Sequence, residues 1–165
     1  MADDENEVSV IRPPDTLKSK VREGGPGAVD LAALERAEAV IANLTDSYLQ
    51  WVQEDLVKIQ TAYDALAAAP EAERKAAADR VFQVAHDIKG QGGSFGYNLM
   101  TVIGNSLCRF IEREPDPSPK HVDVIKVHVD SLKLVIAQNL KGDGGPLGEK
   151  LLAGLNAVID KVAAK

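Results

Sequence analysis

The sequence predicts an all-α protein: an up-and-down four-helix bundle with an additional C-terminal helix and an irregular N-terminal arm. Apolar residues recur at helical spacing through most of the chain after residue 30. No stretch shows the alternation of a half-buried β-strand or the turn residues of a hairpin. The periodic stretches are separated by short segments with proline or glycine, and short connections between amphipathic helices favour antiparallel neighbours.

Length and composition limit the classes of protein to be considered. The chain has 165 residues, of which 45% are hydrophobic and 27% charged, so it suits one globular domain with an appendage. Its net charge of −6 argues against nucleic acid as a partner, because phosphate contacts need clustered Lys and Arg. Cys108 is the single cysteine, which excludes an internal disulfide and fits a reducing compartment. Because the start is acidic and no apolar run approaches about 18 residues, we expect a cytoplasmic protein without membrane contact.

The distribution of proline and glycine divides the chain into three parts. Residues 1–29 are polar and broken by both residue types, which predicts a mobile or extended arm. Residues 30–145 contain the periodic stretches of the bundle, and residues 146–165 form a C-terminal helix packed on it or extending it. The first stretch runs from about Asp30 to Ala69. Its apolar phase continues without slippage, which favours one long helix over two helices that meet near residues 43–45.

Each later helix is marked by an apolar stripe and by its end signals. The second helix begins near Pro70, which suits a first helical position before two glutamates, and it ends near Gly96. A third helix follows over about 98–112. Ser118, before a proline, suits the cap of a helix that runs to about Leu140. The side chains expected to face the core are Ala77, Val81, Val84, Ile88 and Phe95, then Leu99, Val102, Ile103, Leu107, Phe110 and Ile111, then Val122, Ile125, Val129, Leu132 and Ile136, and finally Leu151, Leu155, Val158 and Val162.

One segment of the second helix departs from ordinary helix composition. Glycine costs about 1 kcal/mol relative to alanine within a helix, yet Gly90, Gly92 and Gly93 lie close together while the apolar phase continues to Phe95. At about 100° per residue, the residues that share the outward side of His86, opposite the apolar stripe, are Asp79, Phe82, Gln83, Lys89, Gly90 and Gly93. His86 is therefore expected to face outward beside a cation and a surface without side chains. Gly92 projects to a flank, where it would allow close helix packing.

The order of residues in this segment is specific. His86-Asp87-Ile88-Lys89-Gly90, followed by Gly93 and by Phe95-Gly96, resembles the signature of histidine-containing phosphotransfer (HPt) domains. It is particularly similar to the phosphotransfer module of chemotaxis-type histidine kinases, and the helix order extends the resemblance from about residue 35 to 140. The resemblance implies a four-helix bundle whose outward histidine carries a phosphoryl group from a histidine kinase or a receiver aspartate to a response regulator.

Under this resemblance the residues of the motif have expected roles. His86 would be phosphorylated through Nε2, and Lys89 would neutralise the phosphoryl oxygens. The surface expected to dock the partner consists of Phe82, Gln83, Gly90 and Gly93. The aspartate and Mg²⁺ needed for transfer would belong to the receiver domain, so we expect no metal or cofactor on this chain. It would be a phosphocarrier and not an enzyme.

The sequence departs from the chemotaxis-type pattern at one position of the third helix. In those relatives a polar residue there orients the histidine through Nδ1, and a gapless reading places Cys108 at that position. A thiol performs this role poorly, and we interpret Cys108 as a small half-buried filler. Asn105 or Arg109, a turn before it or just after it, could orient His86 instead, and both alternatives stay open.

Other polar and aromatic residues give no stronger indication of a site. His121 and His128 lie seven residues apart without a cysteine or carboxylate cluster on the same face, so packing or solvation is expected rather than metal binding. Tyr48 and Trp51 are expected in the core or on its flank. Neither a nucleophile–base spacing nor a phosphate-binding loop occurs in the sequence.

We therefore predict a freestanding phosphorelay carrier, a monomer whose histidine kinase and receiver domains are supplied by partners. The alternative is a non-catalytic helical interaction or dimerisation module with a vestigial motif, which would bind through the long first helix and the terminal helix. Acid-labile, alkali-stable phosphate on the protein after incubation with a phosphorylated receiver would separate the two.

Overall fold

A computed structural model of the chain describes residues 31–163, apart from the side chains of residues 41–43, 45 and 46. Within these residues the structure contains helices and no strand, which confirms the all-α prediction. The predicted N-terminal arm, residues 1–29, lies outside the described residues. No helix in the described part is long and apolar enough to cross a membrane.

The first helix is continuous. α1 spans Leu31–Ala68, which confirms the interpretation as one long helix. The chain divides into two compact units between Ala42 and Asn43, and residues 31–40 are exposed. From Tyr48 onward one face of α1 is buried at helical spacing, through Tyr48, Val52, Leu56, Ile59, Tyr63 and Leu66.

The later helices follow the predicted order with shifted ends. α2 spans Arg74–Gly92, α3 spans Asn98–Arg113, α4 spans Pro119–Ala137 and α5 spans Gly145–Ala163, with 3₁₀ turns η1 at Glu71–Glu73 and η2 at Gly93–Phe95. Pro70 therefore precedes a 3₁₀ turn instead of beginning the α-helix. α4 ends at Ala137 rather than near Leu140, because Asn139 adopts a left-handed conformation with φ of 49° that an α-helix cannot contain.

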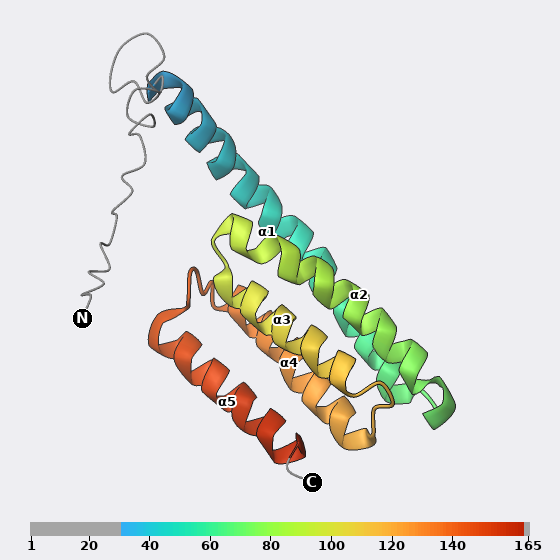
Figure 1. The fold of residues 1–165 in the computed structure, drawn as a ribbon. Helices are drawn as coiled ribbons and strands as arrows, with labels where there is room; N and C mark the ends of the chain where they lie inside the picture. Colours follow the sequence, from blue (N-terminus) through green and yellow to red (C-terminus); the bar gives the residue numbers. More distant parts are fainter. Residues whose placement is uncertain (1–30, 164–165) are drawn as a thin grey trace, which may run out of the picture. The chain divides into compact units, whose positions relative to one another are not determined.

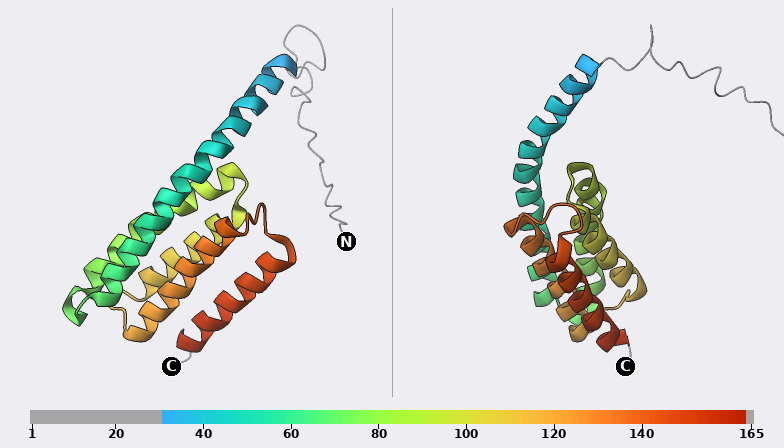
Figure 2. Two further views of the ribbon diagram at one scale, coloured as in Figure 1. Left: turned by 180° about the vertical axis from the view of Figure 1, so that it is seen from behind. Right: turned by 90° about the vertical axis from the view of Figure 1, so that its left-hand side faces the viewer.

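The part of α1 from residue 43 onward and helices α2 to α4 lie side by side as the bundle, and α5 lies along α4 (Figures 1 and 2). α2 contacts α3, and α3 contacts α4. On α1, the ring of Tyr48 stacks on that of Phe95 with centroids 4.5 Å apart. Lys133 of α4 donates from Nζ to Oε1 of Gln60 on α1. The contacts therefore close the four helices around one core.

One residue expected in the core faces solvent instead. Val102 is 47% exposed, because at about 100° per residue it projects to the opposite side of α3 from the buried Ile111. The inward positions of α3 are taken by Leu99, Met100, Ile103, Gly104, Leu107, Cys108, Phe110 and Ile111.

The start of α4 has the predicted cap. Ser118 Oγ accepts a hydrogen bond from the backbone N–H of His121 at 3.4 Å, and His121 Nδ1 accepts one from the backbone N–H of Ser118 at 3.2 Å. These reciprocal bonds form a capping box. They satisfy two backbone donors that the first turn of a helix otherwise leaves unpaired.

The connection between α4 and α5 is bonded to the turn that follows α2. The N–H of Gly142 donates to the carbonyl of Gly96 at 2.6 Å, and the carbonyl of Gly142 accepts from the N–H of Leu99 at 3.3 Å. Nearby, Tyr97 donates its hydroxyl hydrogen to Asn139 Oδ1 at 2.7 Å. α5 itself buries Leu155 and packs its apolar face against the core through the partly buried Leu151, Leu152, Val158, Ile159 and Val162.

Candidate functional site

His86 lies on the outer face of α2. Val81, Ala85 and Ile88 are buried on the other side of the helix, and this anchoring leaves His86 exposed. The ring of Phe82, one turn earlier, stacks on the His86 ring with centroids 6.2 Å apart and planes at 29°. Within residues 31–163 the ring nitrogens of His86 make no hydrogen bond. Both nitrogens are therefore open to a partner.

Two of the three glycines leave the surface next to His86 without side chains. Gly90 and Gly93 are exposed, and a Cβ at position 90 would meet nothing within 4 Å. Gly92 is buried, and a Cβ there would lie 2.7 Å from the Cβ of Met100. The absence of a side chain at Gly92 therefore lets the start of α3 approach α2, as the helical projection predicted.

α2 ends in a hydrogen-bonded cap around Gly96. The N–H of Tyr97 donates to the carbonyl of Gly92 at 2.9 Å, and the N–H of Gly96 donates to the carbonyl of Gly93 at 3.3 Å. These are the two bonds of a Schellman motif. Gly96 has φ of 79°, a left-handed conformation in which a Cβ is unfavourable. The predicted helix end is confirmed, although residues 93–95 form a 3₁₀ turn and not a last α-helical turn.

A hollow of about 520 Å³ lies beside His86, between α2 and α3. It is lined by Phe82, Gln83, His86, Lys89, Asn105, Cys108, Arg109 and Glu112. Asn105 and Arg109, the two candidates to orient the imidazole, therefore share this hollow with it, but neither is hydrogen-bonded to the ring. Glu112 was not identified from the sequence, because its exposed position on α3 becomes part of the site only through the packing of α3 on α2.

Cys108 is the buried thiol of this hollow. Its residue is 3% exposed, more deeply buried than the half-buried filler predicted from the sequence. Burial raises the pKa of the Cys108 thiol, an effect that the Lys89 cation opposes and the Glu112 carboxylate reinforces. The sulfur is therefore held as a neutral thiol near neutral pH, which limits its reactivity.

Two residues of α3 that the sequence analysis missed hold Lys89 in place. A Cβ at position 104 would lie 3.0 Å from the Cβ of Lys89 and 3.2 Å from the carbonyl oxygen of Ala85, so Gly104 permits the close approach of α2 and α3. The hydroxyl of Thr101 donates to the carbonyl of Lys89 at 3.0 Å. A glycine inside an apolar helical pattern, as at Gly104, is the signal in the sequence that indicates such a close approach.

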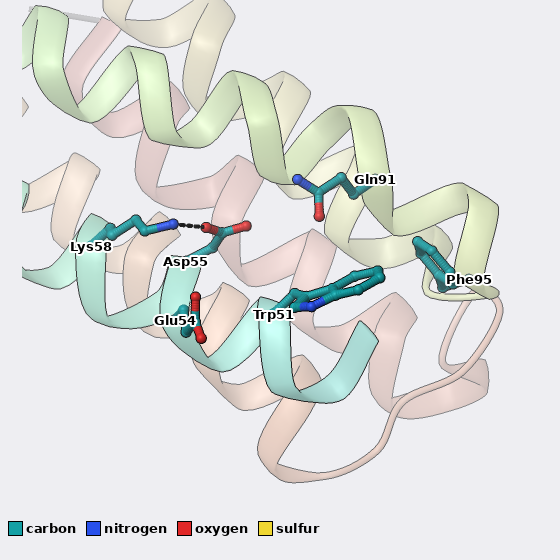
Figure 3. Close-up of a pocket in the computed structure, with 6 residues that line it drawn as sticks. All are labelled: Trp51, Glu54, Asp55, Lys58, Gln91 and Phe95. Carbon is teal, nitrogen blue, oxygen red and sulfur yellow. Dashed lines mark hydrogen bonds and ion pairs between the residues drawn. The ribbon is translucent and has the colours of Figure 1, made fainter. Parts of the chain in front are cut away.

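A second hollow, of about 450 Å³, lies on the other flank of α2 (Figure 3). It is lined by Trp51, Glu54, Asp55, Lys58, Gln91 and Phe95. Trp51 is 45% exposed, and its ring meets Phe95 edge-on with centroids 6.4 Å apart. At the other end of the hollow, Lys58 Nζ donates to Asp55 Oδ1 at 2.8 Å. Trp51 is therefore a flank residue with an accessible aromatic surface, whereas Tyr48 belongs to the core.

The other two histidines do not line the hollow beside His86. His128 is fully buried, with Nε2 3.1 Å from Ser106 Oγ and Nδ1 2.9 Å from the carbonyl oxygen of Val124. Burial lowers the pKa of His128. His121 is part of the α4 cap, with Nδ1 3.6 Å from a carboxylate oxygen of Glu114. Among the described residues, no group of three His, Cys, Asp or Glu side chains could hold a metal ion.

A match to a known protein family identifies the class of protein to which this helical bundle belongs. The family model described as the Hpt domain matches residues 43–162. The match begins where the larger compact unit begins and covers well over half of the chain, which therefore belongs to the Hpt domain family. Hpt domains act in histidine phosphotransfer within two-component phosphorelays. No curated protein and no solved structure matches the chain.

Proposed function

We propose that His86 is the phosphorylated residue of this Hpt domain and that it carries a phosphoryl group from a histidine kinase or a receiver aspartate to a response regulator. The supporting observation is an exposed imidazole without a hydrogen-bond partner among the described residues. The Lys89 side chain lines the same hollow. Exposed backbone at Gly90 and Gly93 leaves room for a partner to approach.

In the proposed transfer, the neutral imidazole attacks the phosphorus atom of an aspartyl phosphate through Nε2. The N–P bond forms as the P–O bond to the aspartate breaks, and the carboxylate leaves with the bonding electron pair. The proton on Nδ1 stays on the ring, which is cationic until that proton passes to solvent. Lys89 neutralises charge on the phosphoryl oxygens, and the receiver supplies the aspartate and Mg²⁺. The same steps in reverse deliver the group to the next receiver.

A partner that reaches His86 also covers the hollow between α2 and α3. A typical interface buries about 800 Å² per partner, which corresponds to a patch with a radius of about 16 Å. Gln83, which lines this hollow, lies about 4.5 Å from His86 along the helix axis. Phe82 is the aromatic side chain that the hollow offers to a partner.

Labelling with phosphoramidate, a small phosphoryl donor, tests the assignment of His86 without a protein partner. Wild-type protein is expected to acquire acid-labile, alkali-stable phosphate, and His86→Gln is expected to acquire none. Because His86 is exposed, the His86→Gln change should alter the free energy of unfolding by no more than about 0.5 kcal/mol. His121→Gln is the matched control, since a glutamine oxygen can replace the capping nitrogen, and it should be labelled like wild type.

Two outcomes would contradict the proposal. Label on the His86→Gln protein would place the phosphorylated residue elsewhere. Wild-type protein that accepts phosphate neither from phosphoramidate nor from any phosphorylated receiver in a broad panel would favour the helical interaction module with a vestigial motif.

A further inference from the structure

The last turn of α2 contains a hydroxyl group that comes from α3. In a continuing α-helix, the N–H of Gly93 would donate to the carbonyl of Lys89, four residues earlier. Here the N–H of Gly93 donates to Oγ1 of Thr101 at 2.9 Å, and the same hydroxyl donates to the carbonyl of Lys89 at 3.0 Å. Thr101 therefore bridges the donor and the acceptor of one helical turn.

This bridge lies where α2 is least able to hold its own shape. Gly90, Gly92 and Gly93 each weaken the helix by about 1 kcal/mol relative to alanine, and the α-helix gives way to a 3₁₀ turn at Gly93. Thr101 is half-buried, and its bond to the Lys89 carbonyl is partly shielded from competition with water, whereas the bond from the Gly93 N–H is exposed. The Thr101 hydroxyl from α3 therefore stabilises a last turn of α2 that its own glycine-rich sequence stabilises poorly.

Thr101 and Gly104 act on the same residue of α2. They lie three residues apart on α3 and hence on one face. Thr101 binds the backbone carbonyl of Lys89, and Gly104 packs against its Cα and Cβ. Both the backbone and the base of the Lys89 side chain are consequently fixed by the neighbouring helix.

We infer that Thr101 is a positioning residue for phosphotransfer at His86. Its hydroxyl holds the backbone of Lys89 and Gly93, and so keeps the Lys89 ammonium group and the bare surface at Gly93 in register with the imidazole. The inference rests on the proposed function of His86. A displacement of about 1 Å in a reacting group can cost as much as about 100-fold in rate, so loss of the bridge should be measurable in transfer.

Three variants isolate the hydroxyl group. Thr101→Val replaces the hydroxyl with a methyl group and leaves the Gly93 N–H and the Lys89 carbonyl unbridged. Thr101→Ser keeps the hydroxyl and removes the methyl group. Thr101→Ala removes both, and serves as the second test should the added methyl group of valine prevent folding. Thr61→Val is the matched control, because the hydroxyl of Thr61 donates to the carbonyl of Val57 within its own helix at 2.9 Å.

The rate of loading by phosphoramidate and the rate of transfer to a receiver that accepts phosphate from wild-type protein are measured for each variant. Thr101→Val and Thr101→Ala are expected to be about tenfold slower in both steps, and Thr101→Ser is expected to restore most of the rate. The backbone amide of Gly93 should exchange with deuterium about tenfold faster in Thr101→Val. Thr61→Val should match wild type in all three measurements.

Other results would overturn either the positioning role of Thr101 or the proposed function of His86. Wild-type rates in Thr101→Val or Thr101→Ala would overturn the inference, as would a Thr101→Ser protein that remains as slow as Thr101→Val. Equal slowing in Thr61→Val would show a general loss of stability and would overturn it as well. Wild-type protein that is not loaded at His86 would overturn the proposed function, and the positioning role with it.

Discussion

Gly104 lies directly against Lys89: a Cβ at position 104 would be 3.0 Å from the Cβ of Lys89 and 3.2 Å from its Cα. We expect Gly104→Ala to lower the free energy of unfolding by up to about 2 kcal/mol. Overpacking costs about 1–3 kcal/mol, and the higher helix propensity of alanine returns about 1 kcal/mol. Because the change pushes on Lys89, phosphotransfer should also slow.

Urea denaturation and the transfer assay measure these two effects. Gly154→Ala on α5 is the matched control, since a Cβ there would meet nothing within 4 Å; it should gain about 1 kcal/mol and transfer normally. A Gly104→Ala protein as stable as Gly154→Ala would show that α2 and α3 can separate at no cost.

Removal of the charge from Lys89 should slow phosphotransfer without unfolding the protein. Lys89→Met keeps most of the half-buried side-chain stem and removes the ammonium group that would face the phosphoryl oxygens. We expect a rate about tenfold or more below wild type and an unfolding free energy within about 0.5 kcal/mol of it. Lys120→Met, an exposed change at the start of α4, is the control. Equal transfer by the Lys89→Met and wild-type proteins would remove Lys89 from the site.

Phe82 is half-buried and packs partly against the core while its ring stacks on His86. We therefore expect Phe82→Ala to cost about 1–2 kcal/mol in folding, less than the roughly 3–5 kcal/mol of a core phenylalanine. Receiver binding should weaken by about 1–2 kcal/mol. Urea denaturation and a receiver titration measure the two quantities. Phe110→Ala, at a residue 7% exposed, should show the larger folding loss with unchanged receiver affinity, and the same result for Phe82→Ala would make Phe82 a core residue only.

Tyr48→Phe should stabilise the protein. The hydroxyl of Tyr48 is buried without a hydrogen-bond partner among the described residues, and burial is the main cause that raises the Tyr48 pKa to about 12. Since an unsatisfied buried hydroxyl costs about 1–3 kcal/mol, its removal should raise the free energy of unfolding by about 1 kcal/mol. Tyr97→Phe should lower it by about 1 kcal/mol, because it loses the bond to Asn139. Urea denaturation that shifts both variants in the same direction would contradict this account.

His128 should make the protein less stable in mild acid. Burial lowers its folded-state pKa below the ordinary value of 6.5, so below that pH the unfolded chain binds more protons than the folded one. The contribution is fully present above about pH 6.5 and is lost as the pH falls, by at most about 1.4 kcal/mol per pH unit. His128→Leu should flatten this part of the stability curve measured by urea denaturation from pH 7.5 to 5.

His121→Gln is the control for the second histidine, which lies close to a carboxylate. His121 faces Glu114, and His121→Gln should leave the acid-induced loss attributable to His128 in place. An unchanged slope in His128→Leu would show that His128 does not titrate with folding.

The sequence predicted the elements because helix signals are local. The 3.6-residue period, the Ser118 cap and the left-handed Gly96 each depend on residues within one or two turns. The same locality placed His86 outward on α2, and its exposure in the structure agrees with that projection. Family membership was recognisable for the same reason, since its motif lies within one helix and its end.

The opposite wall of the site was not predictable in this way. Thr101, Gly104 and Glu112 belong to the site through the register of α3 on α2, and register depends on contacts between helices rather than on the periodicity of either one. The misplacement of Val102 has the same origin, because a single apolar residue does not define which side of a helix is covered. Asn105 and Arg109 share the hollow with His86 through the same inter-helix register.

The two hydrogen bonds of Gly142 tie the end of α2 to the connection before α5, although Gly96 and Gly142 are far apart in sequence. If this connection opened, the carbonyl of Gly96 and the amide of Leu99 would lose their partners. Fraying at the C-terminal side of the protein would therefore reach the turn that ends the histidine-bearing helix. How long that turn stays closed therefore depends in part on the connection before α5. The rate at which the turn opens would be governed by two stretches of chain that are far apart in sequence.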